Sequence, residues 1–324
     1  MKPFKLYNAK TISEATAKLA EYKSTETAKP NAGGSDLLGT LKDNVWTTYP
    51  TMIVSLKAIP NMDYIKVESG TLKIGAMAKL VDIANSTVVK GNWSILADAA
   101  YSVATAPIQN IATLGGNICQ NPRCWYWRSP KSVGRTFNCL RKGGTVCFAV
   151  TGDNRHHSIF GKGCFAPFPS DTAVALGALN AQVKITGTSG DRTVSIMDFY
   201  NTLGNVLKLG EIVTEVQVPT PAAGTKQTYI KFRTRKAMDF AIVSVASAIT
   251  TSGGKVSDSR IVLGAVSTVP YRATKAEAAI KDKTITETIA IAAGEAAVED
   301  AVALSHNSYK IQIAKTLVKR AILA

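Results

Sequence analysis

All five cysteines of this 324-residue chain lie in one short stretch, with none before residue 119 and none after residue 164. In chain order they are Cys119, Cys124, Cys139, Cys147 and Cys164. In a reducing cytoplasm, clustered cysteines are more often metal ligands or redox groups than disulfides. We therefore expect this stretch to fold so that several thiols converge on one site.

The spacing of the last four cysteines bears on the kind of site. They are separated by 14, 7 and 16 residues, and glycines precede the third and the fourth. Structural zinc sites usually contain close cysteine pairs, and none occurs here. Single thiolates on glycine-rich loops suit an iron–sulfur cluster, in which each iron takes one cysteine. The spacing favours a cluster on Cys124, Cys139, Cys147 and Cys164, while zinc and incidental free thiols remain alternatives.

Two further features of the stretch, Cys119 and a pair of histidines, point less clearly to a metal. We expect Cys119 to be a buried apolar residue, since it follows Asn117 closely and stands apart from the other four. His156 and His157 form a weaker metal candidate, because adjacent histidines are more typical of a solvated loop.

The formal net charge of +15 raises the question of an anionic partner. Eight basic residues against one acid, Asp153, lie between Cys119 and Cys164: Arg123, Arg128, Lys131, Arg135, Arg141, Lys142, Arg155 and Lys162. With the aromatic run 125–127 they could stack bases and neutralise phosphates. The same charge would compensate an anionic metal–thiolate cluster. No helix-turn-helix, RNP or zinc-finger pattern accompanies the charge, which disfavours a nucleic-acid partner.

Length and hydropathy predict a soluble globular protein of two domains. A domain of roughly 150 residues is typical, and no apolar run reaches the roughly 18 residues of a membrane span. The basic N-terminus is not followed by the apolar core of a signal peptide, so we expect a cytoplasmic protein.

Apolar periodicity predicts alternating helices and strands up to a linker near residue 222. A capping box at Thr11 and Glu14 opens a helix, and Ser35 or Asp36 can cap a second one. Further elements are expected as strands over 52–56 and 211–219, a hairpin over 64–78 turning at 69–70, helices over 80–89 and 94–104, and a helix and strand over 170–187. Beyond the linker, three strands precede helices that begin near residue 273, an order that indicates a separate α+β domain.

Two glycine pairs each lie between an apolar piece and a helix. In "NAGGSDLLG", residues 31–39, backbone N–H groups can approach a pyrophosphate at a helix start. The stretch is neither a P-loop nor a GxGxxG motif. "ATLGGN", residues 112–117, repeats the arrangement. A plain turn would explain either alone, whereas together they could hold the two ends of an extended ligand.

These two loops, with "PSD" at 169–171 and "YIKFRTRKAMDFAIVSVA" at 229–246, resemble the FAD-binding medium subunit of the molybdenum hydroxylases, the xanthine dehydrogenase family. The resemblance covers nearly the whole chain. It implies an α+β protein with a two-part FAD-binding region of the vanillyl-alcohol-oxidase (PCMH) type over 1–222, with lobes at 1–57 and 58–222. A C-terminal α+β domain of antiparallel strands and helices, like that of the CO dehydrogenase flavoprotein, would occupy 223–324.

The cysteine-rich stretch resembles an insert found in a subgroup of that family. The subgroup includes the β subunit of 4-hydroxybenzoyl-CoA reductase and the FAD subunit of periplasmic aldehyde oxidoreductases, and its insert carries one [4Fe–4S] cluster. The resemblance implies such an insert over 119–168, hereafter the cysteine segment, with Cys124, Cys139, Cys147 and Cys164 as ligands. The long last gap resembles the aldehyde oxidoreductases more than the reductase.

The resemblance also implies the flavin contacts. The first loop would hold the FAD pyrophosphate, the second would form another flavin loop, and Asp171 would bond the ribose or adenine side. Lys231 belongs to the motif that begins the C-terminal domain, as do Arg235 and Asp239. Gln109 stands where many relatives carry arginine, which removes the basis for a charge contact there. The contacts implied are Asn31, Ala32, Gly33, Gly34, Ser35, Asp36, Leu37, Thr113, Gly115, Gly116, Asn117, Asp171 and Lys231.

The expected function follows from these cofactors, since the sequence contains no catalytic triad. Flavin handles electron pairs and iron–sulfur centres handle single electrons, so the chain would be an electron-transfer subunit of an oxidoreductase. The resemblance implies a heterotrimer with a large molybdopterin subunit, where an aldehyde or an aromatic or CoA-thioester substrate reacts, a small [2Fe–2S] subunit and an external electron carrier. Export on a partner's signal would place it in the periplasm instead. A zinc-containing nucleic-acid-binding protein and a free-standing FAD oxidase remain alternatives.

Overall fold

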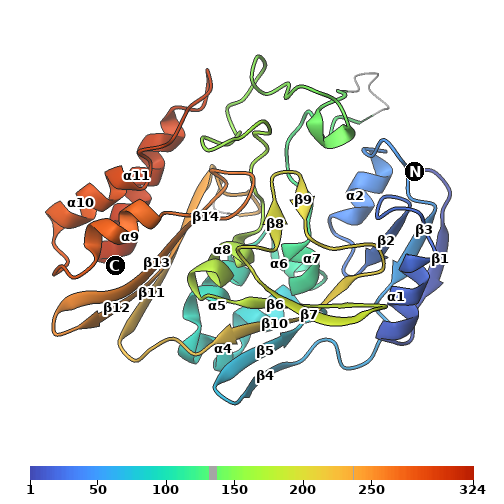
Figure 1. Cartoon of the computed structure of the whole chain (residues 1–324), viewed down its shortest axis with the longest axis horizontal. Coiled ribbons are helices and arrows are strands. Elements are labelled where there is room, and N and C mark those ends of the chain that lie inside the picture. Colours follow the sequence, from blue (N-terminus) through green and yellow to red (C-terminus); the bar gives the residue numbers. More distant parts are fainter. Residues whose placement is uncertain (131–136, 236) are drawn as a thin grey trace.

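The computed structural model describes residues 1–130, 137–235 and 237–324. Lys131 and Arg135, two of the basic residues of the cysteine segment, lie outside the described residues. The described chain forms two main sheets and a two-stranded hairpin in its N-terminal two thirds and a further sheet near the C-terminus, with the cysteine segment above and between the main sheets (Figure 1).

The first lobe is a parallel three-stranded sheet in the order β1-β3-β2. Helices connect its strands, as parallel pairing requires. The Thr11 side chain caps α1 by accepting from the Glu14 N–H at 3.1 Å. Glu14 returns the bond to the Lys10 N–H at 2.8 Å, one residue earlier than in the standard box. The elements are β1 Lys5–Asn8, α1 Ile12–Ala20, β2 Ala28–Asn31, α2 Leu37–Lys42 and β3 Met52–Ser55.

The second lobe is built on an antiparallel sheet in the order β4-β5-β10-β6-β7. Ser69 and Gly70 both have positive φ, 49° and 71°, which is the geometry of a type I′ hairpin and matches the predicted turn. The strands are β4 Ile65–Glu68, β5 Thr71–Gly75, β6 Gln182–Gly187, β7 Gly190–Ser195 and β10 Ile212–Pro219.

Short helices cover this sheet and bury a common core with it. The helix predicted over 80–89 is two helices, because Ser86 has extended backbone and caps the second through the Val89 N–H. The helices are α3 Leu80–Asn85, α4 Thr87–Asn92, α5 Ser94–Tyr101, α6 Ala106–Gln109, α7 Leu114–Ile118 and α8 Asp171–Ala178.

The C-terminal part has strands first and helices last, as predicted. An antiparallel sheet in the order β11-β12-β13-β14 has a separate apolar core in which helix α11 packs on β12. The helices lie together at one side of this sheet (Figure 1). The elements are β11 Thr225–Phe232, β12 Val243–Ser252, β13 Lys255–Gly264, β14 Tyr271–Arg272, α9 Thr274–Ile280, α10 Glu287–Ala296 and α11 Tyr309–Leu323.

The described part of the cysteine segment is mostly loop, with a short 3₁₀ helix, η2, at Leu140–Lys142. It shares a small apolar cluster with α2, in which Trp46 meets Trp127 edge to face at 6.5 Å. A two-stranded hairpin, β8 Tyr200–Asn201 and β9 Gly204–Asn205, stands near it. Within the described residues, no helix combines the length and apolarity needed to cross a membrane.

Candidate functional site: a flavin cavity beside the cysteine segment

A cavity of about 620 Å³ opens where the two lobes, the cysteine segment and the loop after β11 meet. This volume lies in the range of small-molecule and cofactor sites. All residues that the sequence analysis implied as flavin contacts line it, from Asn31–Leu37 and from Thr113–Asn117 except Leu114, together with Asp171 and Lys231. The structure thus gathers one set of residues from four distant parts of the chain, and their contact with flavin remains a prediction.

The first glycine loop fits tightly against the second. A Cβ on Gly33 would lie 2.1 Å from the Ile111 carbonyl oxygen, so only glycine permits this approach. Gly34 has a φ of 79°, in the left-handed region that glycine favours. The N–H groups of Gly33, Gly34 and Ser35 donate to no group within the described residues. They are therefore free to bind an anion in the cavity.

The side chain of Asn31 is a second indication that this loop binds a ligand. Its Oδ1 is buried and has no hydrogen-bond partner among the described residues. Buried acceptors are rarely left unpaired, so a donor such as a ribose hydroxyl of the cofactor would complete it. The residues of the first loop fit the dinucleotide that the resemblance implies.

The second glycine loop differs from the first in its backbone. The Thr113 Oγ1 caps α7 by accepting from the Gly116 N–H at 3.2 Å, and the Gly115 N–H donates to the Ala76 carbonyl at 2.8 Å. The Asn117 N–H donates to the Thr113 carbonyl. These amides are already bonded within the protein, so the loop presents its surface and side chains to the cavity, and the free amides belong to the first loop.

Asp36 begins α2, but its carboxylate forms no capping bond. It accepts from the Asn121 N–H at 3.0 Å and pairs with Arg128 at 2.6 Å and Arg123 at 3.0 Å. Asp36 is the N-cap residue of α2, one of the two predicted, but its side chain does not bond to the helix N–H groups, because two guanidinium groups of the cysteine segment attract the carboxylate more strongly than neutral amides do. Asp36 fastens the cysteine segment to the cavity wall.

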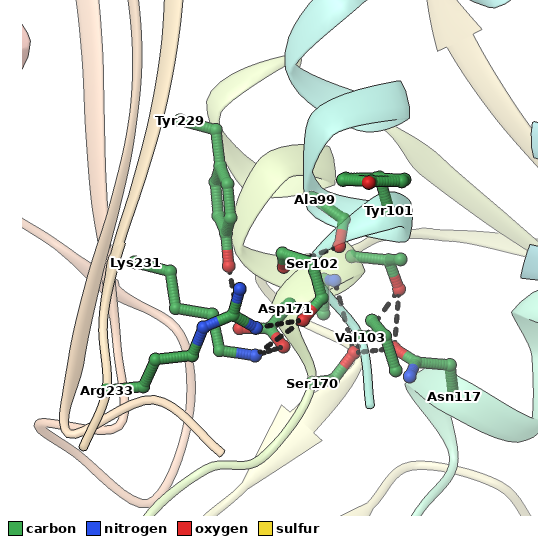
Figure 2. Close-up of polar contacts among 12 residues, drawn as sticks. Ala99, Tyr101, Ser102, Val103, Asn117, Ser170, Asp171, Tyr229, Lys231 and Arg233 are labelled. Carbon is green, nitrogen blue, oxygen red and sulfur yellow. Dashed lines mark hydrogen bonds and ion pairs between the residues drawn. The ribbon is translucent and has the colours of Figure 1, made fainter. Parts of the chain in front are cut away.

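A buried ionic network joins the second lobe to the C-terminal sheet (Figure 2). Asp171, at the start of α8, accepts from the Tyr229 hydroxyl at 2.6 Å and pairs with Lys231 Nζ at 2.7 Å. Both partners reach it from β11. Burial raises the pKa of Tyr229 well above its ordinary value, and the Asp171 carboxylate adds to the shift. Both oxygens of Asp171 already have protein partners, so its main observed role is to hold the two domains together.

Gln109 also has a structural role. The side chain is buried, and its Nε2 donates to the Tyr101 carbonyl at 2.8 Å and to the Val103 carbonyl at 2.7 Å. The carbonyl of Ser102, the residue between Tyr101 and Val103, accepts from Lys231 and from Arg233, each at 3.0 Å (Figure 2). These bonds shape the chain that leads into the cavity wall at Val103.

Of the remaining two residues of the C-terminal motif, Asp239 lines the cavity and Arg235 does not. Asp239 pairs with Arg235, whose guanidinium is largely exposed.

Three thiols of the cysteine segment, those of Cys124, Cys139 and Cys164, share a buried cluster with Trp127, and both Trp127 and Arg141 line the cavity. Cys124, Cys139 and Cys164 are buried, and Cys147 is partly buried. Burial raises the pKa of Cys124 to about 12, and the nearby Cys164 and Cys139 thiols contribute. Burial also raises the pKa of Cys147, and the Cys164 and Cys139 thiols add to the shift.

Two side chains contact these sulfurs. His157 Nε2 lies 3.3 Å from Cys124 Sγ, and Arg141 Nε donates to Cys164 Sγ at 3.3 Å. The expectation of a solvated histidine pair is wrong for His157, which is buried between this thiol and the aromatic rings of Trp125 and Tyr126. The sequence analysis noted Arg141 as one of eight basic residues in the segment. Nothing in the sequence indicated that Arg141, and not one of the other seven, contacts a cysteine sulfur.

The thiols are not arranged around a single ion. No three His, Cys, Asp or Glu side chains in the part of the chain that the structure describes are grouped as ligands of one metal. Tetrahedral zinc needs all its sulfurs about 2.3 Å from one point, whereas a cluster spreads them over separate irons. Cys119 lies apart on the cavity wall, where burial raises its pKa to about 12.

Comparisons with known proteins agree with this architecture. A family model described as the FAD binding domain in molybdopterin dehydrogenase matches residues 2–221, and one described as the CO dehydrogenase flavoprotein C-terminal domain matches residues 227–324. The aldehyde oxidoreductase FAD-binding subunit PaoB of Escherichia coli (strain K12) is 34% identical over 262 residues, which cover 78% of each chain.

Relatives named for carbon monoxide dehydrogenase match over a greater length. The medium chain from Hydrogenophaga pseudoflava is 28% identical over 327 residues, which cover 99% of this chain and 96% of the relative. The solved structure of the Hydrogenophaga pseudoflava enzyme that lacks the Mo-pyranopterin moiety of its cofactor matches with a TM-score of 0.79, covering 100% of this chain and 97% of that chain. The chain belongs to the FAD-binding medium subunits of the molybdenum hydroxylase family, and it is an oxidoreductase subunit.

Proposed function

We propose that this chain is the electron-transfer subunit of a molybdenum hydroxylase complex, and that it holds a [4Fe–4S] cluster beside its FAD. The observation that carries the proposal is the buried cluster of Cys124, Cys139 and Cys164, which also contains Trp127 of the cavity wall. Arg141 contacts Cys164 and also lines the cavity, so one side chain spans the distance between the two sites.

The proposed flavin contacts rest on the cavity wall. The free amides of Gly33, Gly34 and Ser35 would bind the pyrophosphate, and Asn31 Oδ1 would accept from the ribose. Bound flavin exchanges electrons both in pairs and singly. The protein's part is to hold the flavin beside the cysteine segment and to exclude water around it.

The proposed cluster ligands are Cys124, Cys139, Cys147 and Cys164. Support comes from the shared buried cluster of Cys124, Cys139 and Cys164 and from the Arg141 Nε–H, which donates to Cys164 Sγ at 3.3 Å. Within the family, this favours a cluster-containing subunit over a free-standing FAD oxidase, and the FAD-binding family itself disfavours a zinc-containing nucleic-acid-binding protein.

The wider assembly is proposed from the family. The partners would be a large subunit with molybdopterin, a small [2Fe–2S] subunit and an external electron carrier. The relative PaoB is named for aldehyde oxidoreductase, which makes an aldehyde the first substrate class to test. We propose the cytoplasm as its compartment, or the periplasm if a partner carries an export signal.

The proposed domains are residues 1–222, with lobes 1–57 and 58–222 and the cysteine segment at 119–168, and residues 223–324. The two family models meet between 221 and 227, which supports this division.

The first test is an absorption spectrum of the chain purified without oxygen, with iron, sulfide, zinc and FAD assayed on the same sample. Flavin bands over a broad iron–sulfur absorption, with about four irons per chain, are expected. FAD without iron would indicate a simple flavoprotein and would contradict the cluster. About one zinc in place of iron would mean a structural zinc site.

A pair of variants then assigns the ligands. Cys147→Ser should remove iron while FAD remains bound, because Cys147 does not line the flavin cavity. Cys119→Ser is the matched control, since Cys119 stands apart from the other four thiols, and it should keep the iron. Equal loss of iron and FAD in Cys147→Ser would show that the segment is a folding element instead.

A further inference from the structure

Lys29 places a positive charge on the cavity wall just before the first glycine loop. The residue belongs to β2, is partly buried and lines the cavity. Its Nζ has neither a hydrogen bond nor an ion pair within the described residues. Glu26 acts on the amine from a distance and raises its pKa, but burial has the larger effect and lowers the pKa of Lys29. In the part of the chain that the structure describes, the amine thus has no opposite charge in contact with it.

An aromatic ring holds this amine on the wall. Lys29 Nζ lies 5.3 Å from the ring centroid of Trp46, which is a cation–π contact. Trp46 in turn meets Trp127 of the cysteine segment edge to face, and both indoles line the cavity. Lys29 therefore lies at the part of the cavity wall that adjoins the cysteine segment.

Lys29 shares one face of β2 with a second residue that has no partner. Side chains two residues apart on a strand lie on the same face, and Lys29 and Asn31 are so spaced and both line the cavity. Lys29 offers an unpaired donor, and Asn31 offers an unpaired acceptor. Since buried polar groups are rarely left without partners, this face of β2 indicates a ligand that completes both.

The proposed contacts decide which end of FAD lies at Lys29. Asp171 is assigned to the ribose or adenine side, and the first loop is assigned to the pyrophosphate. The flavin ring then occupies the rest of the cavity, and the proposed function requires it beside the cysteine segment, where Lys29 and Trp46 lie. Positive charge near the ring nitrogens is one of the means by which a protein tunes a flavin.

We propose that Lys29 binds the flavin ring of FAD and raises its two-electron reduction potential. Two electrons and one proton convert the neutral ring to an anion, so a cation in contact with the ring stabilises the reduced form more than the oxidised form. The inference rests on the proposed function, because the position of the ring beside the cysteine segment is part of that proposal. It does not require the iron–sulfur cluster.

The test compares three variants of the full chain. Lys29→Met removes the charge and keeps a long side chain, whereas Lys29→Arg keeps the charge and can still stack on an aromatic face. Lys42→Met is the matched control, because it also removes one lysine from the first lobe, but Lys42 is exposed on α2 and does not line the cavity. FAD and iron are assayed in each protein, and the midpoint potential of the bound FAD is measured from its absorbance in an anaerobic redox titration.

We expect Lys29→Met to keep its FAD and to lower the flavin potential by about 30 mV, which is a tenfold change in a two-electron equilibrium. Lys29→Arg should recover most of the potential, and Lys42→Met should leave it unchanged. An unchanged or raised potential in Lys29→Met would overturn the inference. An equal shift in Lys42→Met would also overturn it, because the charge would then act through the whole molecule and not at the ring.

These measurements distinguish a failure of this inference from a failure of the proposed function. If the unaltered chain holds FAD but no iron, the proposed cluster fails, and the flavin potentials still decide whether Lys29 tunes the ring. If Lys29→Met loses FAD while Lys42→Met keeps it, Lys29 is needed to retain the cofactor and does not tune it, which overturns the inference alone. An unaltered chain that binds no FAD would contradict both.

Discussion

Gly33 determines how closely the two flavin loops approach. Its missing Cβ leaves room for the Ile111 carbonyl, and three backbone N–H groups of the loop have no acceptor among the described residues. Neither property depends on side-chain chemistry, which is why a motif without a P-loop or a GxGxxG spacing can still form an anion site.

We predict that Gly33→Ala releases most of the bound FAD. A Cβ 2.1 Å from a backbone oxygen forces the two loops apart and displaces the amides from the cofactor. The FAD-to-protein ratio after gel filtration measures the effect, and full flavin retention would contradict it. Gly39→Ala in α2 is the matched control, because nothing lies within 4 Å of its added Cβ. That control should keep FAD and gain roughly 0.5–1 kcal/mol of helix stability.

The buried pair of Asp171 and Lys231 predicts an asymmetric response to substitution. Their side chains are only 6% and 4% exposed. Lys231→Met leaves the carboxylate buried without its cation, and we expect a loss of roughly 3–5 kcal/mol. The double variant Asp171→Asn, Lys231→Met should recover much of that loss, because no net charge then remains in the core. Urea unfolding at saturating FAD measures both, and equal destabilisation of the single and double variants would show that the charge is not the cause.

At the scale of elements, helix α11 anchors the cysteine segment through a buried amine. Lys310 Nζ donates to the carbonyls of Ala265, His157 and His156 at 2.6, 3.1 and 3.3 Å, and no carboxylate of the described residues is in contact with it. Burial lowers the pKa of Lys310 to about 7. His157, whose pKa burial lowers to about 4, stays neutral near pH 7.

This arrangement predicts that the protein becomes more stable as the pH rises from about 7 to about 10. The unfolded lysine, with a pKa of about 10.4, then binds more protons than the folded one, so the free energy of unfolding increases with pH by at most about 1.4 kcal/mol per unit. Denaturation midpoints across this range measure the slope. Lys310→Met should remove it, whereas Lys319→Met on the same helix, where the lysine pairs with Glu287, should keep it. A slope that survives Lys310→Met would contradict the assignment.

At the scale of the whole molecule, the cysteine segment joins parts that the chain itself separates. Asp36 fastens it to the first lobe, and Asn154 fastens it to the C-terminal domain. Asn154 is fully buried, with Nδ2 donating to the carbonyls of Ala149 and Gly152 and to the Ser305 hydroxyl, and with Oδ1 accepting from the His306 N–H.

We predict that Asn154→Asp detaches the segment from the C-terminal domain. A carboxylate would face two carbonyl oxygens that have lost their donor, at a cost of about 1–3 kcal/mol for each unsatisfied group. Limited proteolysis should then cut within 119–168 before the rest of the chain, while Asn138→Asp, at an exposed position of the same segment, should leave the pattern unchanged. Resistance of Asn154→Asp to cleavage would contradict the anchoring role.

Local sequence rules accounted for most elements and failed where distant residues intervened. The Ser69–Gly70 turn and the Thr11 cap depend on neighbouring residues alone, and both appear as predicted. Asp36 was expected to cap its helix, but arginines about 90 residues later take its carboxylate. The sequence predicted a solvated loop for His157. In the structure the side chain is buried, because the fold brings distant residues such as Trp125 into contact with it.

The sequence by itself determined the order of the elements, the two glycine loops and the confinement of every thiol to one segment, because each depends on residue type and short-range spacing. Only the tertiary structure decided that the two loops share one cavity, that Cys124, Cys139 and Cys164 share one buried cluster, and that Arg141 contacts Cys164 and lines the cavity. These last facts join residues as far apart as Asn31 and Lys231. Such pairings are set by the packing of the sheets and their cores, since periodicity in one segment carries no information about which distant segment it meets.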